Sequence, residues 1–244
     1  MALEKLKDAD GVNKNVKVAP VLVLCDTSGS MKEYVGTLQK CLDAMVGTLK
    51  QSNSLRNSVD LCIATFNADF DILLPFTRLP YVGSVPQIQP SEWGTYLGTA
   101  VKKAVELLAE EKEKLKAAGD YVQPALIILS DGMPEHEDDK VTKAGIAELQ
   151  KKIDEERWNC TPILMGRRFA GQDTVLGKYG LKGKAFIFDS TDQASNIIAG
   201  IKFASASVRC TTEGNTSSME TLYDHVNRLT KMGRNHLFLG KFEL

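Results

Sequence analysis

The sequence predicts a doubly wound α/β fold, in which helices cover both faces of a mostly parallel sheet. Short runs of β-branched and aliphatic residues alternate with longer stretches whose apolar residues recur every three or four positions. The chain has 244 residues, of which 43% are hydrophobic and 25% charged. This composition is typical of a globular protein with a sizeable core.

Continuous apolar runs predict the strands, and such runs are typical of strands buried on both faces of a parallel sheet. They are Val18–Cys25, Val59–Phe66, Ile72–Leu74, Pro124–Leu129, Pro162–Met165 and Ala185–Phe188. The link Asn67–Asp71 is too short for a parallel crossover, so the second and third strands should form an antiparallel hairpin.

Apolar residues at helical spacing predict the helices between these strands. Their apolar faces span Val35–Leu49, Leu97–Leu115, Ile146–Ile153 and Ile197–Ala204, with a short helix expected within Gln172–Tyr179. A polar stretch, Thr211–Ser218, precedes a further helical pattern. We therefore divide the chain into an α/β domain, residues 1–208, and a C-terminal extension with an amphipathic helix, residues 209–244.

The C-terminal extension has two interpretations. Its apolar residues either pack back on the domain or form a docking element for another protein. These residues are Met219–Met232 together with Leu237, Phe238, Leu239 and Phe242.

Charge and cysteine usage narrow the function classes. The chain has 30 Lys and Arg residues and 31 Asp and Glu residues. It therefore lacks the excess of positive charge that favours binding to the phosphates of a nucleic acid. No run approaches the ~20 apolar residues of a membrane helix, and Met1–Lys14 lacks the apolar region of a secretory signal. The five cysteines show neither a CxxC pair nor a disulfide framework, so we expect buried thiols and a cytoplasmic protein.

Polar residues follow the predicted strands at their carboxyl ends, where ligands bind in open α/β sheets. Asp26, Ser28 and Ser30 follow the first strand, Asp131 follows the fourth, and Thr95 begins the second long helix. Two carboxylates and three hydroxyls form a hard oxygen set, which suits Mg²⁺ or Mn²⁺ better than zinc. A metal with so few anionic ligands would attract a carboxylate from another molecule.

The residues of this set resemble the metal-ion-dependent adhesion site of the von Willebrand factor A domain. VLVLCDTSGSM carries the DxSxS signature as Asp26, Ser28 and Ser30; WGTYLGTAV, with Thr95, is similar to the family's threonine loop; and ILSDGMP, with Asp131, to its aspartate loop. The resemblance implies a Rossmann-like, mostly parallel central sheet with one antiparallel edge strand and helices on both faces. It also implies a Mg²⁺ (or Mn²⁺) site that binds the Asp or Glu of a protein partner.

The resemblance to this family covers roughly Val16–Val208. Within the family, the chain looks most like stand-alone bacterial proteins associated with tellurium resistance. The supporting features are a strand close to the N-terminus, the DGxP loop and the Ser/Ala-rich stretch FASASV. The likeness implies a role in the tellurium or stress response and a kinase or phosphatase as partner. Trp93 replaces the usual first glycine of the threonine loop, which changes the rim of the site.

Residues around the site have structural as well as functional interpretations. Trp93, beside Thr95, is either an exposed anchor for a partner or part of the core. The acidic run is either a solvated loop or part of the rim, where it would favour basic partners. This run consists of Glu135, Glu137, Asp138 and Asp139.

The sequence lacks several common catalytic signatures. There is no GxSxG elbow and no GxGxxG loop, and GQDTVLGK lacks the P-loop spacing. The histidines at 136, 225 and 236 are expected outside the metal site, which leaves no obvious general base. We therefore predict a cation-dependent protein-binding module and not an enzyme. The alternatives are a scaffold whose metal site is merely stabilising, and a metal-dependent phosphatase or hydrolase.

Overall fold

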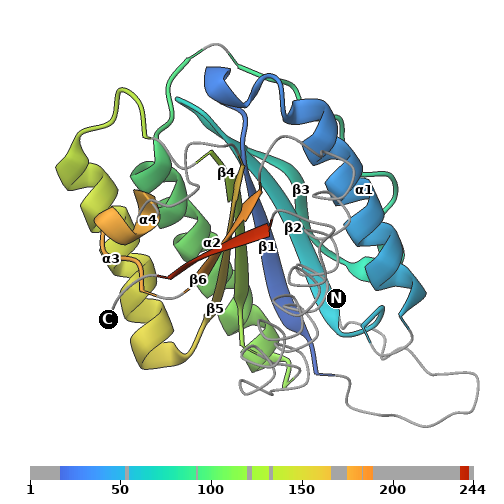
Figure 1. The fold of residues 1–244 in the computed structure, drawn as a ribbon. Coiled ribbons are helices and arrows are strands. Elements are labelled where there is room, and N and C mark those ends of the chain that lie inside the picture. The colour runs from blue at the N-terminus through green and yellow to red at the C-terminus, as the bar shows by residue number, and fades with distance from the viewer. Residues whose placement is uncertain are drawn as a thin grey trace, which may run out of the picture.

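The computed structural model describes residues 17–52, 55–91, 93–119, 123–131, 134–165, 175–182, 184–188 and 237–241. Within these ranges seven strands form one sheet in the order β3-β2-β1-β4-β5-β6-β7 (Figure 1). The strands are β1 (Ala19–Asp26), β2 (Val59–Phe66), β3 (Phe70–Arg78), β4 (Ala125–Ser130), β5 (Asn159–Met165), β6 (Lys184–Phe188) and β7 (Leu237–Lys241). The helices are α1 (Val35–Gln51), α2 (Leu97–Ala117), α3 (Asp139–Glu156) and α4 (Val175–Lys178), with short 3₁₀ helices η1 (Gly29–Met31) and η2 (Leu79–Tyr81).

The centre of the sheet is parallel, which confirms the predicted fold class. β1 pairs in parallel with β2 on one side and β4 on the other, and β4, β5 and β6 continue the parallel order. The predicted hairpin is also confirmed, because β3 lies antiparallel to β2 at one edge. The neighbouring carboxyl ends of β1 and β4 bring their following loops together.

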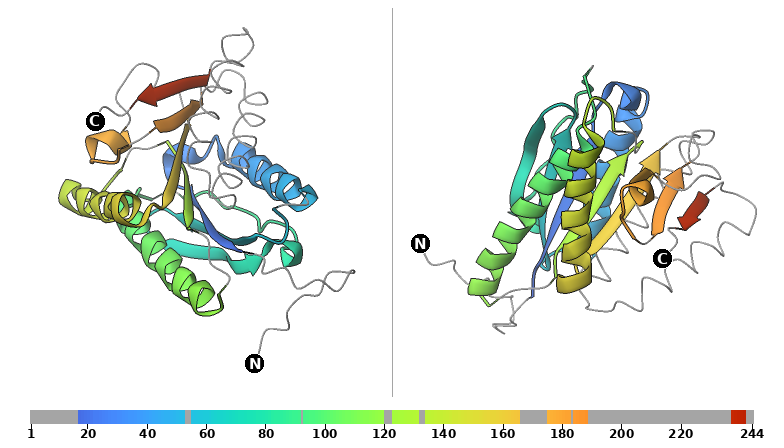
Figure 2. Two further views of the ribbon diagram at one scale, coloured as in Figure 1. Left: turned by 90° about the horizontal axis from the view of Figure 1, so that it is seen from below. Right: turned by 90° about the vertical axis from the view of Figure 1, so that its left-hand side faces the viewer.

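A second antiparallel strand, which the sequence analysis did not anticipate, lies at the other edge. β7 pairs with β6, with Phe188 opposite Leu237 and Lys184 opposite Lys241 (Figure 2). This part of the C-terminal extension therefore joins the sheet. The helices expected at 197–204 and 219–232, and the boundary at 208–209, lie outside the described residues.

Helices cover both faces of the sheet, as Figure 2 shows. Side chains of β1 alternate between two cores, because successive residues of a strand point to opposite faces. Val21 and Val23 pack in the core on the α1 side, whereas Leu22 and Leu24 pack with α2 and α3. Burial of β1 on both faces explains its continuous apolar sequence.

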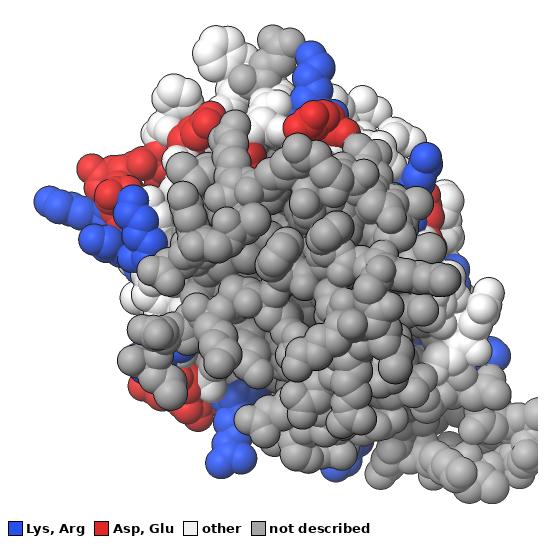
Figure 3. Space-filling model, in the orientation of Figure 1, with Lys and Arg blue, Asp and Glu red and all other residues white. Residues whose placement is uncertain are grey.

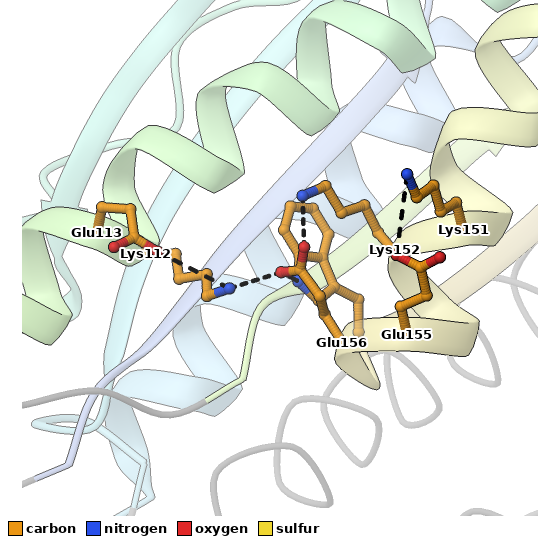
Figure 4. Close-up of polar contacts among 7 residues, drawn as sticks. Lys112, Glu113, Lys151, Lys152, Glu155 and Glu156 are labelled. Atoms are coloured by element: carbon orange, nitrogen blue, oxygen red, sulfur yellow. Dashed lines mark hydrogen bonds and ion pairs between the residues drawn. The ribbon is translucent and has the colours of Figure 1, made fainter.

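α2 and α3 cross at a pair of glycines. A Cβ atom at Gly145 would lie 2.1 Å from the carbonyl oxygen of Gly98, and one at Gly98 would lie 2.4 Å from Thr142 Cα. Farther along the two helices, Glu156 accepts hydrogen bonds of 2.5 Å from both Lys112 and Lys152 (Figure 4). The glycine contact and the Lys112–Glu156 pair hold α3 against α2, whereas the Lys152–Glu156 bond lies within α3.

Charged side chains of both signs are visible in Figure 3. On the face that it shows, the described Lys and Arg side chains lie around the margin beside described Asp and Glu side chains. No helix among the described residues combines the length and apolar character needed to span a membrane. Four cysteines lie in the described ranges and all are free thiols; Cys210 lies outside these ranges.

Candidate metal centre

Asp26 is the central carboxylate of the candidate site. It is the last residue of β1 and is fully buried. Its Oδ1 accepts a 2.9 Å hydrogen bond from the backbone N–H of Ser28, and its Oδ2 accepts a 2.6 Å bond from Ser130 Oγ. Ser130 is the last residue of the neighbouring strand β4. Asp26 therefore links the two loops that carry four of the five predicted ligands.

Asp131 lies close enough to Asp26 to affect its ionisation. Burial raises the pKa of Asp26 to about 6; the hydrogen bonds from Ser130 and Ser28 oppose this rise, and the charge of Asp131 adds to it. Asp131 is itself buried. A cation between such carboxylates would favour their charged forms, because it offsets both the burial and the repulsion.

Ser28 and Ser30 bring two hydroxyls together beside Asp26. Their Oγ atoms lie 3.2 Å apart, and Ser28 is buried whereas Ser30 is half-buried within η1. The DxSxS segment thus folds as a compact turn after β1, with its side-chain oxygens grouped at the carboxyl edge of the sheet.

Thr95 contributes a buried hydroxyl that has no partner. Its side chain is 0% exposed, and its Oγ1 atom accepts and donates no hydrogen bond. Among the described residues, only Asp60 Oδ1 shares this condition. A buried polar group without a partner calls for a physical explanation, such as a water or an ion that completes it.

The start of α2 is tied to both of the other loops. Thr95 and Glu135 exchange backbone hydrogen bonds of 2.9 and 3.2 Å, which attaches the chain to the loop after β4. Tyr96 N–H donates to Asn67 O at 2.9 Å, and Asn67 Nδ2 donates to Thr27 Oγ1 at 3.2 Å, which attaches it to the loop after β1. Thr95 is therefore held at the same edge as Asp26.

Sequence reasoning missed the supporting residues. Ser130 directly precedes Asp131, and a hydroxyl at the end of an otherwise apolar strand was the available signal. Asn67 begins the turn after β2, where Asn is common for conformational reasons alone. Its contact with Thr27 joins segments that are 40 residues apart, so no local sequence pattern predicts it.

Glu137 departs from the solvated-loop interpretation of the acidic run, whereas Glu135, Asp138 and Asp139 are exposed as that interpretation expects. Its Oε2 accepts from Gly98 N–H at 2.7 Å and from Thr142 Oγ1 at 2.8 Å. Its Oε1 accepts from the N–H of Thr99 at 2.9 Å and from its Oγ1 at 2.7 Å. The carboxylate thus caps the first turn of α2 from outside that helix.

The next two acidic residues are also used structurally. Asp138 is the N-cap of α3 and accepts a 2.7 Å hydrogen bond from Lys140 N–H. Asp139 accepts a 2.8 Å bond from the hydroxyl of Tyr179, just beyond α4. Glu137 and Asp138 thus cap the N-terminal ends of α2 and α3, where carboxylates are favoured.

The residues predicted for the rim are exposed. Trp93 is 73% exposed, which excludes the core interpretation of its side chain. Glu135 and His136 are exposed in the loop after β4, and Glu135 lies beside Thr95 through their backbone bridge.

The donor set fits a hard divalent cation. The described residues contain no group of three His, Cys, Asp or Glu side chains placed to hold a metal. A cation held here would therefore rely on hydroxyl or water oxygens as well as on the two carboxylates. Two carboxylates with hydroxyls, one of them buried and unpartnered, are ligands for Mg²⁺ or Mn²⁺. Ligation by the five residues stays a prediction.

The comparison with protein families identifies the segment that carries this site. Residues 21–133 match the von Willebrand factor type A domain. The matched segment runs from β1 to the loop after β4, a little under half of the chain, and contains all five candidate ligands. The fold described above, with its mostly parallel sheet between helices, is the von Willebrand factor A fold. Curated proteins gave no match.

Solved structures share the fold. The pilus adhesin SpaC from Lactobacillus rhamnosus GG, in its open conformation, has a TM-score of 0.58 at 12% identity, covering 81% of this chain and 31% of that chain. A von Willebrand factor type A protein from Catenulispora acidiphila has a TM-score of 0.54 at 13% identity, covering 79% and 43%. Proximal thread matrix protein 1 from the mussel byssus has a TM-score of 0.52 at 15% identity, covering 80% and 49%. The matches thus span a third to a half of these longer proteins, and at such identities they show the fold alone.

Proposed function

We propose that this chain is a divalent-cation-dependent protein-binding module. In this proposal Asp26, Ser28, Ser30, Thr95 and Asp131 hold Mg²⁺ or Mn²⁺, directly or through water. One observation carries it: the buried Thr95 hydroxyl lacks a partner at the same sheet edge where two buried carboxylates, Asp26 and Asp131, lie near each other. A cation would satisfy the hydroxyl and offset the carboxylate repulsion.

The cation would supply an open coordination position for an Asp or Glu of the partner. Exposed Trp93 lies two residues before Thr95 and would serve as an apolar anchor, since Trp is enriched at the energetic centres of interfaces. Glu135 is exposed beside Thr95. Its negative charge would favour a partner that carries basic groups around the Asp or Glu that binds the cation. The two rim residues thus favour a protein ligand over a free carboxylate.

The sequence likeness to tellurium-resistance proteins supports a finer version of the proposal. In it, the module works in the cytoplasm in a tellurium or stress response and binds a kinase or phosphatase. The free thiols Cys25, Cys41, Cys62 and Cys160 are consistent with a reducing compartment. The near-zero net charge does not favour nucleic acid as the partner.

We also infer that the site binds and does not catalyse. The side chains that hydrogen-bond to Asp26 are the hydroxyls of Ser28 and Ser130, which are not general bases at neutral pH. A phosphatase assay with Mg²⁺ and Mn²⁺ tests this inference. Turnover that is lost in Asp26→Ala would overturn it in favour of a metal-dependent hydrolase.

The proposal is tested by thermal unfolding with Mg²⁺, Mn²⁺ or Ca²⁺, for the wild type and for Asp26→Ala. A cation that binds only the folded protein raises the unfolding midpoint once its concentration exceeds its dissociation constant. We expect Mg²⁺ and Mn²⁺ to raise the midpoint of the wild type and not that of the variant. A midpoint that no cation moves would contradict the site. A shift without any metal dependence of partner binding would instead favour the scaffold.

A further inference from the structure

We propose that Glu137 is a positioning residue of the metal centre, whose carboxylate fixes the first turn of α2 and so sets the place of Thr95. The inference rests on the proposed metal site. It concerns a residue outside the predicted ligand set, on the loop that joins β4 to α3.

The first turn of α2 depends on Glu137 for its capping. The N-cap residue, Tyr96, makes no side-chain hydrogen bond to the helix, and the first turn contains no acidic residue. Glu137 accepts hydrogen bonds from the N–H groups of Gly98 and Thr99. At the start of a helix these groups have no acceptor within the helix. Its negative charge also suits the positive end of the helix dipole.

Glu137 is itself held by α3. Thr142 Oγ1 donates to its Oε2 at 2.8 Å, and Thr142 is fully buried where α3 meets Gly98. The carboxylate therefore lies between two helices whose backbones touch at their glycines. A group fixed on both sides can define the position of a helix end, which a freely rotating surface carboxylate cannot.

The loop that contains Glu137 also carries Asp131 and contacts Thr95. Its backbone pairs with Thr95 at Glu135, and two residues later Glu137 binds the first turn of α2. Thr95 and Asp131 are 36 positions apart in the sequence, yet this loop connects them through both contacts. Positioning by Glu137 would thus act on the relative placement of two proposed ligands.

Asp138 provides a matched control for a purely stabilising cap. It is the adjacent residue and another helix-capping carboxylate, but its side chain accepts a hydrogen bond from Lys140 N–H of α3, the helix that it caps itself. Removing either carboxylate should lower stability, because capping side chains typically contribute about 1 kcal/mol. Only the loss of Glu137 should disturb the metal centre.

The experiment compares Glu137→Ala, Glu137→Gln and Asp138→Ala at a temperature where all are folded. Amide hydrogen exchange of the metal-free proteins reports on Thr95, Gly98 and Thr99, and calorimetry gives the Mg²⁺ dissociation constant. We expect Glu137→Ala to speed exchange at these amides and to weaken Mg²⁺ binding about 10–100-fold, as is typical when support of a metal ligand is lost. Glu137→Gln, which keeps one acceptor oxygen, should be intermediate, and Asp138→Ala should match the wild type in both readouts.

Faster exchange in Glu137→Ala with unchanged Mg²⁺ affinity would overturn the inference, since the cap would then be structural only. An equal loss of Mg²⁺ affinity in Asp138→Ala would also overturn it, because the loss of any helix cap on this loop would then weaken the metal site. If Glu137→Ala does not fold, Glu137→Gln carries the same test. A wild type that binds neither Mg²⁺ nor Mn²⁺ would instead refute the proposed function, a failure that the wild-type titration alone identifies.

Discussion

Ser130 donates a 2.6 Å hydrogen bond to Asp26, although the two residues lie 104 positions apart in the chain. They end the neighbouring parallel strands β4 and β1, so the sheet itself brings them together. The bond favours the charged form of the Asp26 carboxylate against burial, which raises its pKa to about 6. Metal binding and proton binding should therefore compete at this carboxylate.

We predict that Mg²⁺ affinity falls as the pH falls through about 6. Asp26 must release its proton to bind a cation, so below its pKa the apparent affinity drops by about tenfold per pH unit. Ser130→Ala removes a bond that lowers the pKa, and it should move the fall in affinity to higher pH. Calorimetric titration between pH 5 and 8 measures both profiles, and an affinity independent of pH across this range would contradict the prediction.

The fold followed from local patterns where one segment carries its own signal. The continuous apolar run of β1 predicted a strand buried on two faces, and the short link after β2 predicted the hairpin. β7 carried no such signal, because Leu237–Lys241 is short and its partner β6 ends 49 positions earlier at Phe188. Edge pairing of this kind is set by tertiary packing.

The ligand set of the candidate site could be listed from motifs, but its support could not. Glu137 belongs to an acidic run that local reasoning assigns to solvent. The residues of α2 that it caps lie 38 and 39 positions away in the sequence. The unpartnered state of the Thr95 hydroxyl likewise depends on burial by distant segments. Such facts belong to three-dimensional packing, which single-sequence patterns do not encode.

We predict that Gly145→Ala destabilises the protein by about 2 kcal/mol or more. Its new Cβ would lie 2.1 Å from the carbonyl oxygen of Gly98, so α3 would have to move away from α2. Gly47→Ala is the matched control within α1, where a Cβ meets nothing within 4 Å. That variant should gain about 0.5–1 kcal/mol. Chemical denaturation of both variants measures the difference, and equal stabilities would refute the close glycine contact.

We predict that Glu156→Gln lowers stability by about 1 kcal/mol at neutral pH. Partial burial raises the pKa of Glu156, but hydrogen bonds and charges from Lys112 and Lys152 outweigh it and lower the pKa to about 2. Because the folded-state pKa is depressed, the stabilisation is present above pH 4.5 and is lost as the pH falls through about 2.

Glu155→Gln is the control for this pair of lysine contacts (Figure 4). Glu155 faces Lys151 at 3.9 Å, and both side chains are mostly exposed. Its replacement should change stability by less than about 0.5 kcal/mol. Urea unfolding at pH 7 compares the two variants. Equal effects would show that the Lys112–Glu156 pair between α2 and α3 stabilises the protein no more than an exposed ion pair does.

We predict that Asp60→Asn becomes increasingly favourable relative to the wild type as the pH rises from 4 to 7. Burial raises the pKa of Asp60 to about 6 despite Arg78, whose Nε lies 3.9 Å away. The folded protein therefore binds the proton more tightly than the unfolded chain, and wild-type stability falls as the pH rises through this window. Urea unfolding at pH 4 and pH 7 measures the difference. A constant difference between the two proteins would contradict the buried, unpartnered Oδ1 of Asp60.

The central claim is that the buried, unpartnered hydroxyl of Thr95 is completed by a bound metal, and Thr95→Val tests this claim most directly. The substitution keeps the shape of the side chain and removes an unpartnered hydroxyl, whose burial costs about 1–3 kcal/mol. Thermal unfolding with and without Mg²⁺ should show a metal-free variant at least as stable as the wild type, but with little or no rise in midpoint when Mg²⁺ is added. An equal rise in both proteins would contradict the claim, as would a metal-free variant that is markedly less stable than the wild type.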